Sequence, residues 1–215
     1  MLFDLDGTLI DSKRGIFNAV QYTIERMSIP EEDRPKDLNP FIGPPLRDSF
    51  KSLFNLSDES SEFATRIYRE YYSETGLYEY DIYKGVNESL HKLVDKGFSM
   101  SVVTSKAEVY AKLIIESAPF KECFSIISGC ELDGRRSAKQ ELIDYTIDRL
   151  KIQPSKEVLM IGDRYHDIRG AKLSGVSSAA VLYGYGTLSE LQNESPTLFI
   201  NSPADLALLE SLITE

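Results

Sequence analysis

The strongest constraint on the fold is the order of segments after Tyr80, where short apolar runs alternate with amphipathic helical patterns. Strands that alternate with helices in this way form a parallel sheet that is covered on both faces. The sequence therefore predicts an α/β core. We expect its strands at 98–104, 124–128, 157–162, 177–183 and 197–200, and its helices at 86–97, 107–118, 139–150, 167–174 and 203–214.

The stretch between residues 13 and 80 has a different character. Its apolar spacing predicts a helix over 13–27, a second that begins near Pro44-Pro45, and a third over 58–73, with no clear strand. The apolar segment 1–5 lies ahead of this stretch, cannot pair alone, and must join the core sheet. We expect a core domain of residues 1–12 and 81–215, interrupted by a helical cap domain of residues 13–80.

The composition of the chain argues against several classes of binding partner. The 215 residues can bury a core without disulfides or a structural metal. Lys and Arg total 24 against 34 Asp and Glu, and this net charge of −10 repels nucleic acid and anionic lipid. No apolar run approaches a membrane span, no signal-peptide pattern is seen, and Cys123 and Cys130 form no CxxC pair. We expect a cytoplasmic monomer or homodimer with no nucleic-acid or membrane partner.

Polar residues collect where the expected strands end. Asp4 and Asp6 follow the first strand, Thr104-Ser105 ends the second, and Asp163 follows the long apolar strand, with Asp167 shortly after it. Ligands of open α/β sheets bind outside the carboxyl ends of the strands. Strand alternation places Asp4 and Asp6 on the same side. These side chains are therefore expected at one edge of the sheet.

Carboxylates gathered in this way raise one another's pKa unless a cation neutralises them. Oxygen ligands suit a hard cation, and Mg²⁺ characteristically binds one or two carboxylates together with phosphate and water. The acids predict a Mg²⁺ site that would also offset the acidic surface for an anionic substrate. For Asp163 or Asp167 alone, a simple helix-capping role is an equal alternative.

Lys139 is a second candidate for the site. Ser137 and Gln140 resemble a capping box, which puts Lys139 in the first turn of its helix. A cation there opposes the helix dipole, and an anion in front of it would explain its position. A solvated lysine is the alternative. Ser105 with Glu108 also fits a capping box, so Ser105 is either a cap or a site residue.

Four segments of the chain resemble, in order, the four motifs of the haloacid dehalogenase-like hydrolase superfamily. They are DLDGT at 4–8, the strand ending in Thr104-Ser105, Lys139, and Gly162-Asp163 with Asp167. The insertion after the first motif and the segments 41–50, 161–171 and 183–187 are similar to its phosphoglycolate phosphatase-like branch, some of whose members are 5′-nucleotidases or general phosphatases. The resemblance implies a Rossmann-like parallel core with an inserted α-helical cap.

The resemblance also implies roles. Asp4 would be the nucleophile that becomes an aspartyl-phosphate, and Asp6 the general acid and then base. Mg²⁺ would bind Asp4, the main-chain carbonyl of Asp6, and Asp163, with Asp167 supporting the metal shell or Lys139. Thr104 and Lys139 would hold the phosphoryl oxygens. Further candidates for contact with the phosphate or the substrate are Gly7, Thr8, Ser105 and Arg47.

These residues predict a Mg²⁺-dependent phosphomonoester phosphatase that acts on a small phosphorylated metabolite. Asp6 argues against dehalogenases and phosphonatases, whose second position is not an acid, and Thr8 favours a phosphatase over a sugar phosphomutase. A phosphomutase, or a phospho-acceptor regulatory domain without turnover, remains an alternative.

Three further points stay open. The lysine motif lacks the common Lys-Pro pair, so Arg135 or Arg136 could share the phosphate role. Arg47 would give the cap a cationic edge that selects the substrate, or it would pair with Asp48 or a nearby acid. Only three residues precede Asp4, so the first strand is unusually short and its packing at a sheet edge is in doubt, as is whether residue 1 is the native start.

Overall fold

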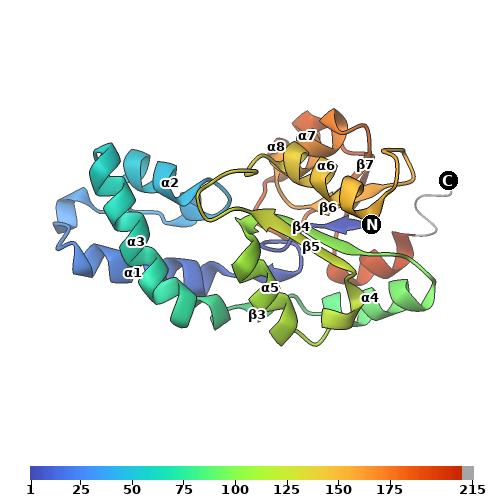
Figure 1. The fold of residues 1–215 in the computed structure, drawn as a ribbon, viewed down its shortest axis with the longest axis horizontal. Coiled ribbons are helices and arrows are strands. Elements are labelled where there is room, and N and C mark those ends of the chain that lie inside the picture. The colour runs from blue at the N-terminus through green and yellow to red at the C-terminus, as the bar shows by residue number, and fades with distance from the viewer. Residues whose placement is uncertain (210–215) are drawn as a thin grey trace. The chain divides into compact units, whose positions relative to one another are not determined.

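The structure is a computed structural model and describes residues 1–209. The chain divides into two compact units (Figure 1). The first comprises Met1–Asp11 and Ile82–Glu215, and the second is Ser12–Asp81. These boundaries differ by one residue from those expected for the core and the cap. The chain passes between the units at two short strands that pair with each other, β2 (Ile10–Asp11) and β3 (Asp81–Ile82).

The first unit is built on a six-stranded parallel sheet with strand order β5-β4-β1-β6-β7-β8. The prediction of a Rossmann-like parallel core is confirmed. β1 has only two residues, but it lies between β4 and β6, with Leu2 opposite both Ser101 and Met160. It is therefore a central strand, not an edge. The six strands are β1 (Leu2–Phe3), β4 (Ser101–Ala107), β5 (Ile126–Cys130), β6 (Leu159–Gly162), β7 (Ser177–Val181) and β8 (Leu198–Ile200).

Helices cover both faces of this sheet. Figure 1 shows α6 and α7 on one side and α4 and α5 on the other. The helices of this unit are α4 (Val86–Asp95), α5 (Glu108–Ser117), α6 (Lys139–Leu150), α7 (Tyr165–Leu173) and α8 (Leu188–Glu194), with 3₁₀ turns at Lys121–Cys123 and Pro203–Leu208.

Strand alternation divides the core between the two faces. Leu2 packs with Val103 and Met160 in a cluster that includes α6 residues such as Leu142. Phe3, the next residue, packs edge-on against Phe124, with ring centroids 5.9 Å apart. Burial of each such side chain stabilises the fold by about 1.5–3 kcal/mol. This packing fixes the carboxyl ends of β1, β4 and β6, where the candidate site lies.

The second unit is helical. Its core is a group of aromatic rings, in which Phe41 and Phe50 lie 4.9 Å apart and Tyr68 stacks on Tyr72 at 5.3 Å. Its helices are α1 (Lys13–Arg26), α2 (Leu46–Leu53) and α3 (Asp58–Glu74), with 3₁₀ turns at Glu31–Asp33, Asn39–Phe41 and Gly76–Tyr78.

Several local predictions are wrong. α6 begins after Ala138, not Ser137, and no side chain caps it. β4 continues through Lys106 to Ala107, which pairs with Cys130, so Ser105 is a strand residue and not a helix cap. The helix expected at 203–214 is a 3₁₀ helix as far as Leu208, and its end lies outside the described residues. Among residues 1–209, no helix has the length and apolar character to cross a membrane.

Candidate active site

Three acidic side chains meet at the carboxyl end of the central strands. Asp4 follows β1, Asp163 follows β6, and Asp167 lies in the first turn of α7. One carboxylate oxygen of each lies within 4.8 Å of the others. β1 and β6 are neighbouring parallel strands, so their carboxyl ends adjoin. The sheet therefore brings together acids that are about 160 positions apart in the chain.

Lys139 faces two of these acids. Its Nζ lies 3.0 Å from Asp4 Oδ1 and 2.7 Å from Asp167 Oδ1, and it donates to the carbonyl oxygen of Val103 at 3.1 Å. Burial alone would lower the pKa of Lys139, but the charges of Asp167 and Asp4 outweigh it and raise that pKa. The ammonium is therefore fully charged at neutral pH.

Burial dominates the electrostatics of the acids. Burial, with the charges of Asp167 and Asp6, raises the pKa of Asp4 to about 6, although Lys139 opposes the shift. Burial and the charges of Asp167 and Asp4 also hold the pKa of Asp163 well above its usual value. Three buried carboxylates thus cluster near one buried ammonium, and a further cation would relieve the excess negative charge.

The donor set fits Mg²⁺. Asp163 is fully buried, and its Oδ1 has no hydrogen-bond partner among the described residues. Asp167 is engaged on both oxygens, because Oδ1 faces Lys139 and Oδ2 accepts from the main-chain N–H of Arg164 at 3.0 Å. An oxygen-only set with an open, buried carboxylate oxygen suits a hard divalent cation. Asp4 and Asp163 are therefore the best-placed candidates for side-chain ligands, and Asp167 forms an ion pair with Lys139.

The segment after Asp4 turns sharply back on itself. Gly7 has a φ of 80°, and its N–H donates to the carbonyl oxygen of Ile10 at 2.8 Å. A Cβ on Gly7 would lie 2.2 Å from Asp163 Oδ2, so glycine is required there. Thr8 is fully buried beside this turn.

Asp6 is paired with a residue that sequence reasoning did not assign to the site. Lys106 Nζ lies 3.1 Å from Asp6 Oδ2, and the Lys106 side chain is buried. Asp6 Oδ1 is buried and has no hydrogen-bond partner within residues 1–209. The available signal was spacing: Lys106 is two residues after Thr104, and a strand places residues i and i+2 on the same face.

The expected phosphate contacts on β4 lie at the same edge. Thr104 is buried, and its Oγ1 accepts from the main-chain N–H of Lys106 at 3.2 Å. Ser105 Oγ donates to the carbonyl oxygen of Ser137 at 3.4 Å, which links the strand to the segment before Lys139.

The three candidate arginines have other partners. Arg47, in the second unit, forms an exposed ion pair with Asp58 at 3.3 Å, not with Asp48. Arg135 pairs with Asp133 at 2.7 Å. Arg136 pairs with Glu131 at 2.8 Å, and its guanidinium lies 3.8 Å from the centre of the Tyr145 ring. Lys139 is therefore the better candidate for the phosphate-binding cation.

A family model described as haloacid dehalogenase-like hydrolase matches residues 1–181. The chain belongs to the haloacid dehalogenase-like hydrolase family. The motif resemblance is confirmed, and the six-stranded core with its separate helical unit agrees with it.

Relatives within this family carry different names. The chain is 40% identical over 213 residues to a 5′-nucleotidase of Pseudomonas aeruginosa, covering 99% of this chain and 94% of the relative. It is 31% identical over 214 residues to the tyrosine-protein kinase PtkA of Mycobacterium tuberculosis, covering 99% of this chain and 72% of the relative. The chain is also 30% identical to a phosphoglycolate phosphatase of Aquifex aeolicus, covering 100% of this chain and 98% of the relative.

Among solved structures, a predicted phosphatase from Clostridium acetobutylicum matches with a TM-score of 0.88 and 38% identity, covering 97% of each chain. The phosphatases among the relatives and structural neighbours identify this haloacid dehalogenase-like hydrolase as a phosphatase.

Proposed function

We propose that this phosphatase hydrolyses phosphomonoesters of small metabolites through an aspartyl-phosphate on Asp4, with Mg²⁺ as its cofactor. The observation that carries the proposal is the cluster of Asp4, Asp163 and Asp167, two of which, Asp4 and Asp167, form ion pairs with the buried ammonium of Lys139. A carboxylate attacks a phosphate dianion slowly unless positive charge offsets the repulsion between them. The sheet edge has the ammonium groups of Lys139 and Lys106, and it has a set of carboxylate oxygens suited to a metal cation.

The residues divide the reaction into two transfers. In the first, an Asp4 carboxylate oxygen forms a bond to phosphorus, the ester P–O bond breaks, and Asp6 gives its proton to the leaving oxygen. In the second, Asp6 takes a proton from water as the water oxygen attacks phosphorus, and the Asp4–phosphorus bond breaks to release phosphate. Both aspartates return to their starting states.

The residues around Asp4 and Asp6 would position the phosphoryl group and neutralise its charge. Lys139 and Thr104 hold the phosphoryl oxygens, and Asp167 keeps Lys139 in place. Mg²⁺, held by Asp4, Asp163 and the main-chain carbonyl of Asp6, would screen charge on the phosphoryl group and on the carboxylates. Gly7 and Thr8 shape the turn that carries Asp6.

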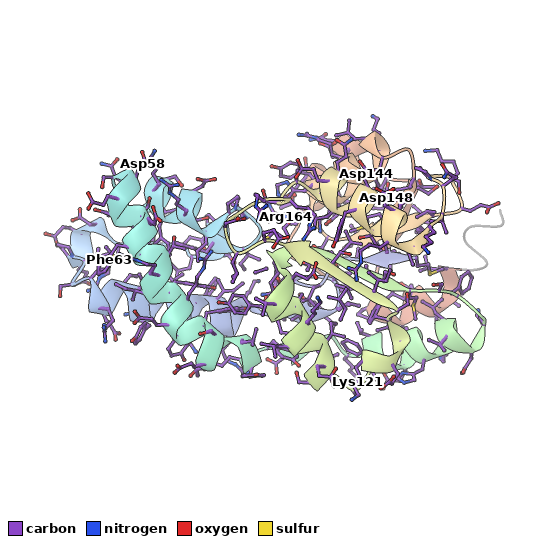
Figure 2. The ribbon with its side chains drawn as sticks, viewed as in Figure 1. Asp58, Phe63, Lys121, Asp144, Asp148 and Arg164 are labelled. Atoms are coloured by element: carbon purple, nitrogen blue, oxygen red, sulfur yellow. The ribbon has the colours of Figure 1, made fainter. Side chains whose placement is uncertain are left out.

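A hydrolysis screen across metabolite monophosphates, including 5′-nucleotides and phosphoglycolate, tests the activity and ranks the substrates. We expect phosphate release from at least one ester, no release by Asp4→Asn, and normal release by the matched control Asp148→Asn, an exposed acid on α6 (Figure 2). Release by Asp4→Asn at the native rate would contradict Asp4 as the nucleophile.

The metal requirement is tested separately. Chelator should abolish activity, Mg²⁺ should restore it, and Ca²⁺ should substitute poorly because it takes more ligands with looser geometry. Full activity in excess chelator would contradict Mg²⁺ dependence.

Phosphoryl transfer to a tyrosine hydroxyl is a second candidate, favoured by the similarity to a protein named tyrosine-protein kinase. The same Asp4 intermediate would serve, with a tyrosine in place of water as the acceptor. Product analysis separates the two, since hydrolysis yields free phosphate and transfer yields phosphotyrosine. The same analysis detects a mutase, which would return phosphate to the product.

We also propose a cytoplasmic location and a monomeric or homodimeric state. The two cysteines, Cys123 and Cys130, form no disulfide in residues 1–209, and this supports the location.

A further inference from the structure

We propose that the loop of residues 183–187, Tyr-Gly-Tyr-Gly-Thr, positions Asp163 by occupying one oxygen of its carboxylate and leaving the other for a cation. The inference rests on the metal site of the proposed function and adds the residues that position one of its ligands, Asp163. The loop itself contributes no side-chain ligand in this scheme.

The main chain of the loop holds the carboxylate directly. The N–H of Tyr185 donates to Asp163 Oδ2 at 2.7 Å, while Oδ1 is buried with no hydrogen-bond partner among residues 1–209. A ligand carboxylate fixed through one oxygen presents the other in a defined direction. The two oxygens of Asp163 are therefore unequal before any ion arrives.

The two glycines of the loop are required by contact with Asp163. A Cβ on Gly184 would lie 2.3 Å from Asp163 Cβ, and a Cβ on Gly186 would lie 1.9 Å from the Asp163 carbonyl oxygen. Neither glycine has a positive φ, so close approach and not backbone conformation requires the missing side chain. Any larger residue would separate the loop from Asp163.

The two tyrosines tie the loop to the segment that carries the nucleophile. The Tyr183 hydroxyl donates to the carbonyl oxygen of Thr8 at 3.0 Å, and the Tyr185 hydroxyl donates to Asp11 Oδ1 at 3.0 Å. The Tyr183 ring packs edge-on against Tyr83, with centroids 5.2 Å apart. The loop thus bridges Asp163 and the turn after Asp4, and it fixes their relative positions.

Isothermal titration calorimetry of Mg²⁺ binding to the substrate-free enzyme tests whether the loop positions Asp163. Gly186→Ala should weaken Mg²⁺ binding about 10- to 100-fold, the effect typical of lost support for a metal ligand. Its kcat should recover toward the wild-type value when Mg²⁺ is raised to saturation. Gly15→Ala is the matched control, because its Cβ would meet the Gly76 carbonyl oxygen at 2.0 Å inside the helical unit. It should lower the Tm without changing the Kd for Mg²⁺.

A second variant covers the case in which Gly186→Ala does not fold. The double variant Tyr183→Phe/Tyr185→Phe keeps both rings and the Tyr185 N–H but loses both hydroxyl ties. It should weaken Mg²⁺ binding about 10-fold, at the lower end of the same range. An unchanged Kd for this variant, with any folded Gly186→Ala also unchanged, would overturn the inference.

Failure of the inference and failure of the proposed function give different results. If wild type and Asp163→Asn bind Mg²⁺ equally, or wild type binds none, the proposed metal site is wrong. If Asp163→Asn loses binding while the loop variants retain it, the metal site stands and the positioning role is wrong.

Discussion

At the scale of single residues, Lys139 shows what a local pattern can and cannot predict. Its place in the first turn of a helix, where a cation opposes the dipole, indicated a nearby anion. The structure places Asp4 and Asp167 there, at 3.0 and 2.7 Å. The expected cap at Ser137 is wrong, because α6 starts one residue later, at Lys139 itself. The pattern therefore predicted that an anion lies near Lys139, but it did not predict where the helix begins.

Removal of this ammonium should slow the chemistry. Lys139→Ala should lower kcat about 10²- to 10³-fold, since it deletes the fixed charge that we propose to face the phosphoryl group. Arg135→Ala, which breaks only an exposed pair with Asp133, should leave kcat unchanged. Steady-state kinetics on the best substrate of the screen measures both. Equal losses in the two variants would mean that Arg135 shares the phosphate role.

Substitution of Asp6 should affect acid–base catalysis without affecting Mg²⁺ binding. Asp6→Asn should lower kcat about 10²- to 10⁴-fold through loss of proton transfer. It should bind Mg²⁺ like the wild type, because the proposed ligand is the Asp6 main-chain carbonyl. Kinetics together with calorimetry checks the pair of outcomes, and a large loss of Mg²⁺ affinity would show that the Asp6 side chain is itself a ligand.

At the scale of elements, periodicity predicted the helices and strands better than their ends. The range of α6 was predicted correctly, and the parallel order follows from the alternation of strands and helices. β4 runs three residues further than expected because Ala107 pairs with Cys130, a contact distant in sequence. That extension places Lys106 beside Asp6. Short β1 is held by neighbours on both sides, and no local pattern encodes such support.

The helical unit offers a test of substrate selection on α2. In the proposed function the core motifs would contact only the phosphate and the metal, so we propose that Arg47 recognises an anionic leaving group. Arg47→Ala should then raise KM for an anionic ester and leave a small neutral reporter ester unaffected. Lys51→Ala is the matched control, since Lys51 lies on the same helix and pairs with the same Asp58 at 2.8 Å. It should change neither KM.

Other outcomes for Arg47 have distinct meanings. No change on either substrate would make Arg47 a surface residue that only pairs with Asp58. Equal losses on both substrates would indicate a disturbed helical unit and not a lost contact with substrate.

At the scale of the whole molecule, the buried acids link stability to pH. Because burial raises the pKa of Asp4 to about 6, the folded protein binds this proton more tightly than the unfolded chain does. Without metal, the contribution of Asp4 to stability is therefore present near pH 4 and is lost as pH rises through about 6. Asp163 acts in the same direction, since its pKa is also raised. A net charge of −10 adds general repulsion at neutral pH.

Mg²⁺ should reverse this loss, and more strongly as pH rises. A ligand that binds only the folded state at 100 times its Kd stabilises by about 2.7 kcal/mol, which raises the Tm of a chain of this size by roughly 5–11 °C. Protons compete with Mg²⁺ for Asp4 and Asp163, so at a fixed Mg²⁺ concentration the increase in Tm should be larger at pH 7 than at pH 5. Thermal unfolding with and without Mg²⁺ at pH 5, 6 and 7 measures this increase in Tm. Asp163→Asn should show little increase at any of these values, and an equal increase at pH 5 and pH 7 in the wild type would mean that the ion binds away from these buried carboxylates.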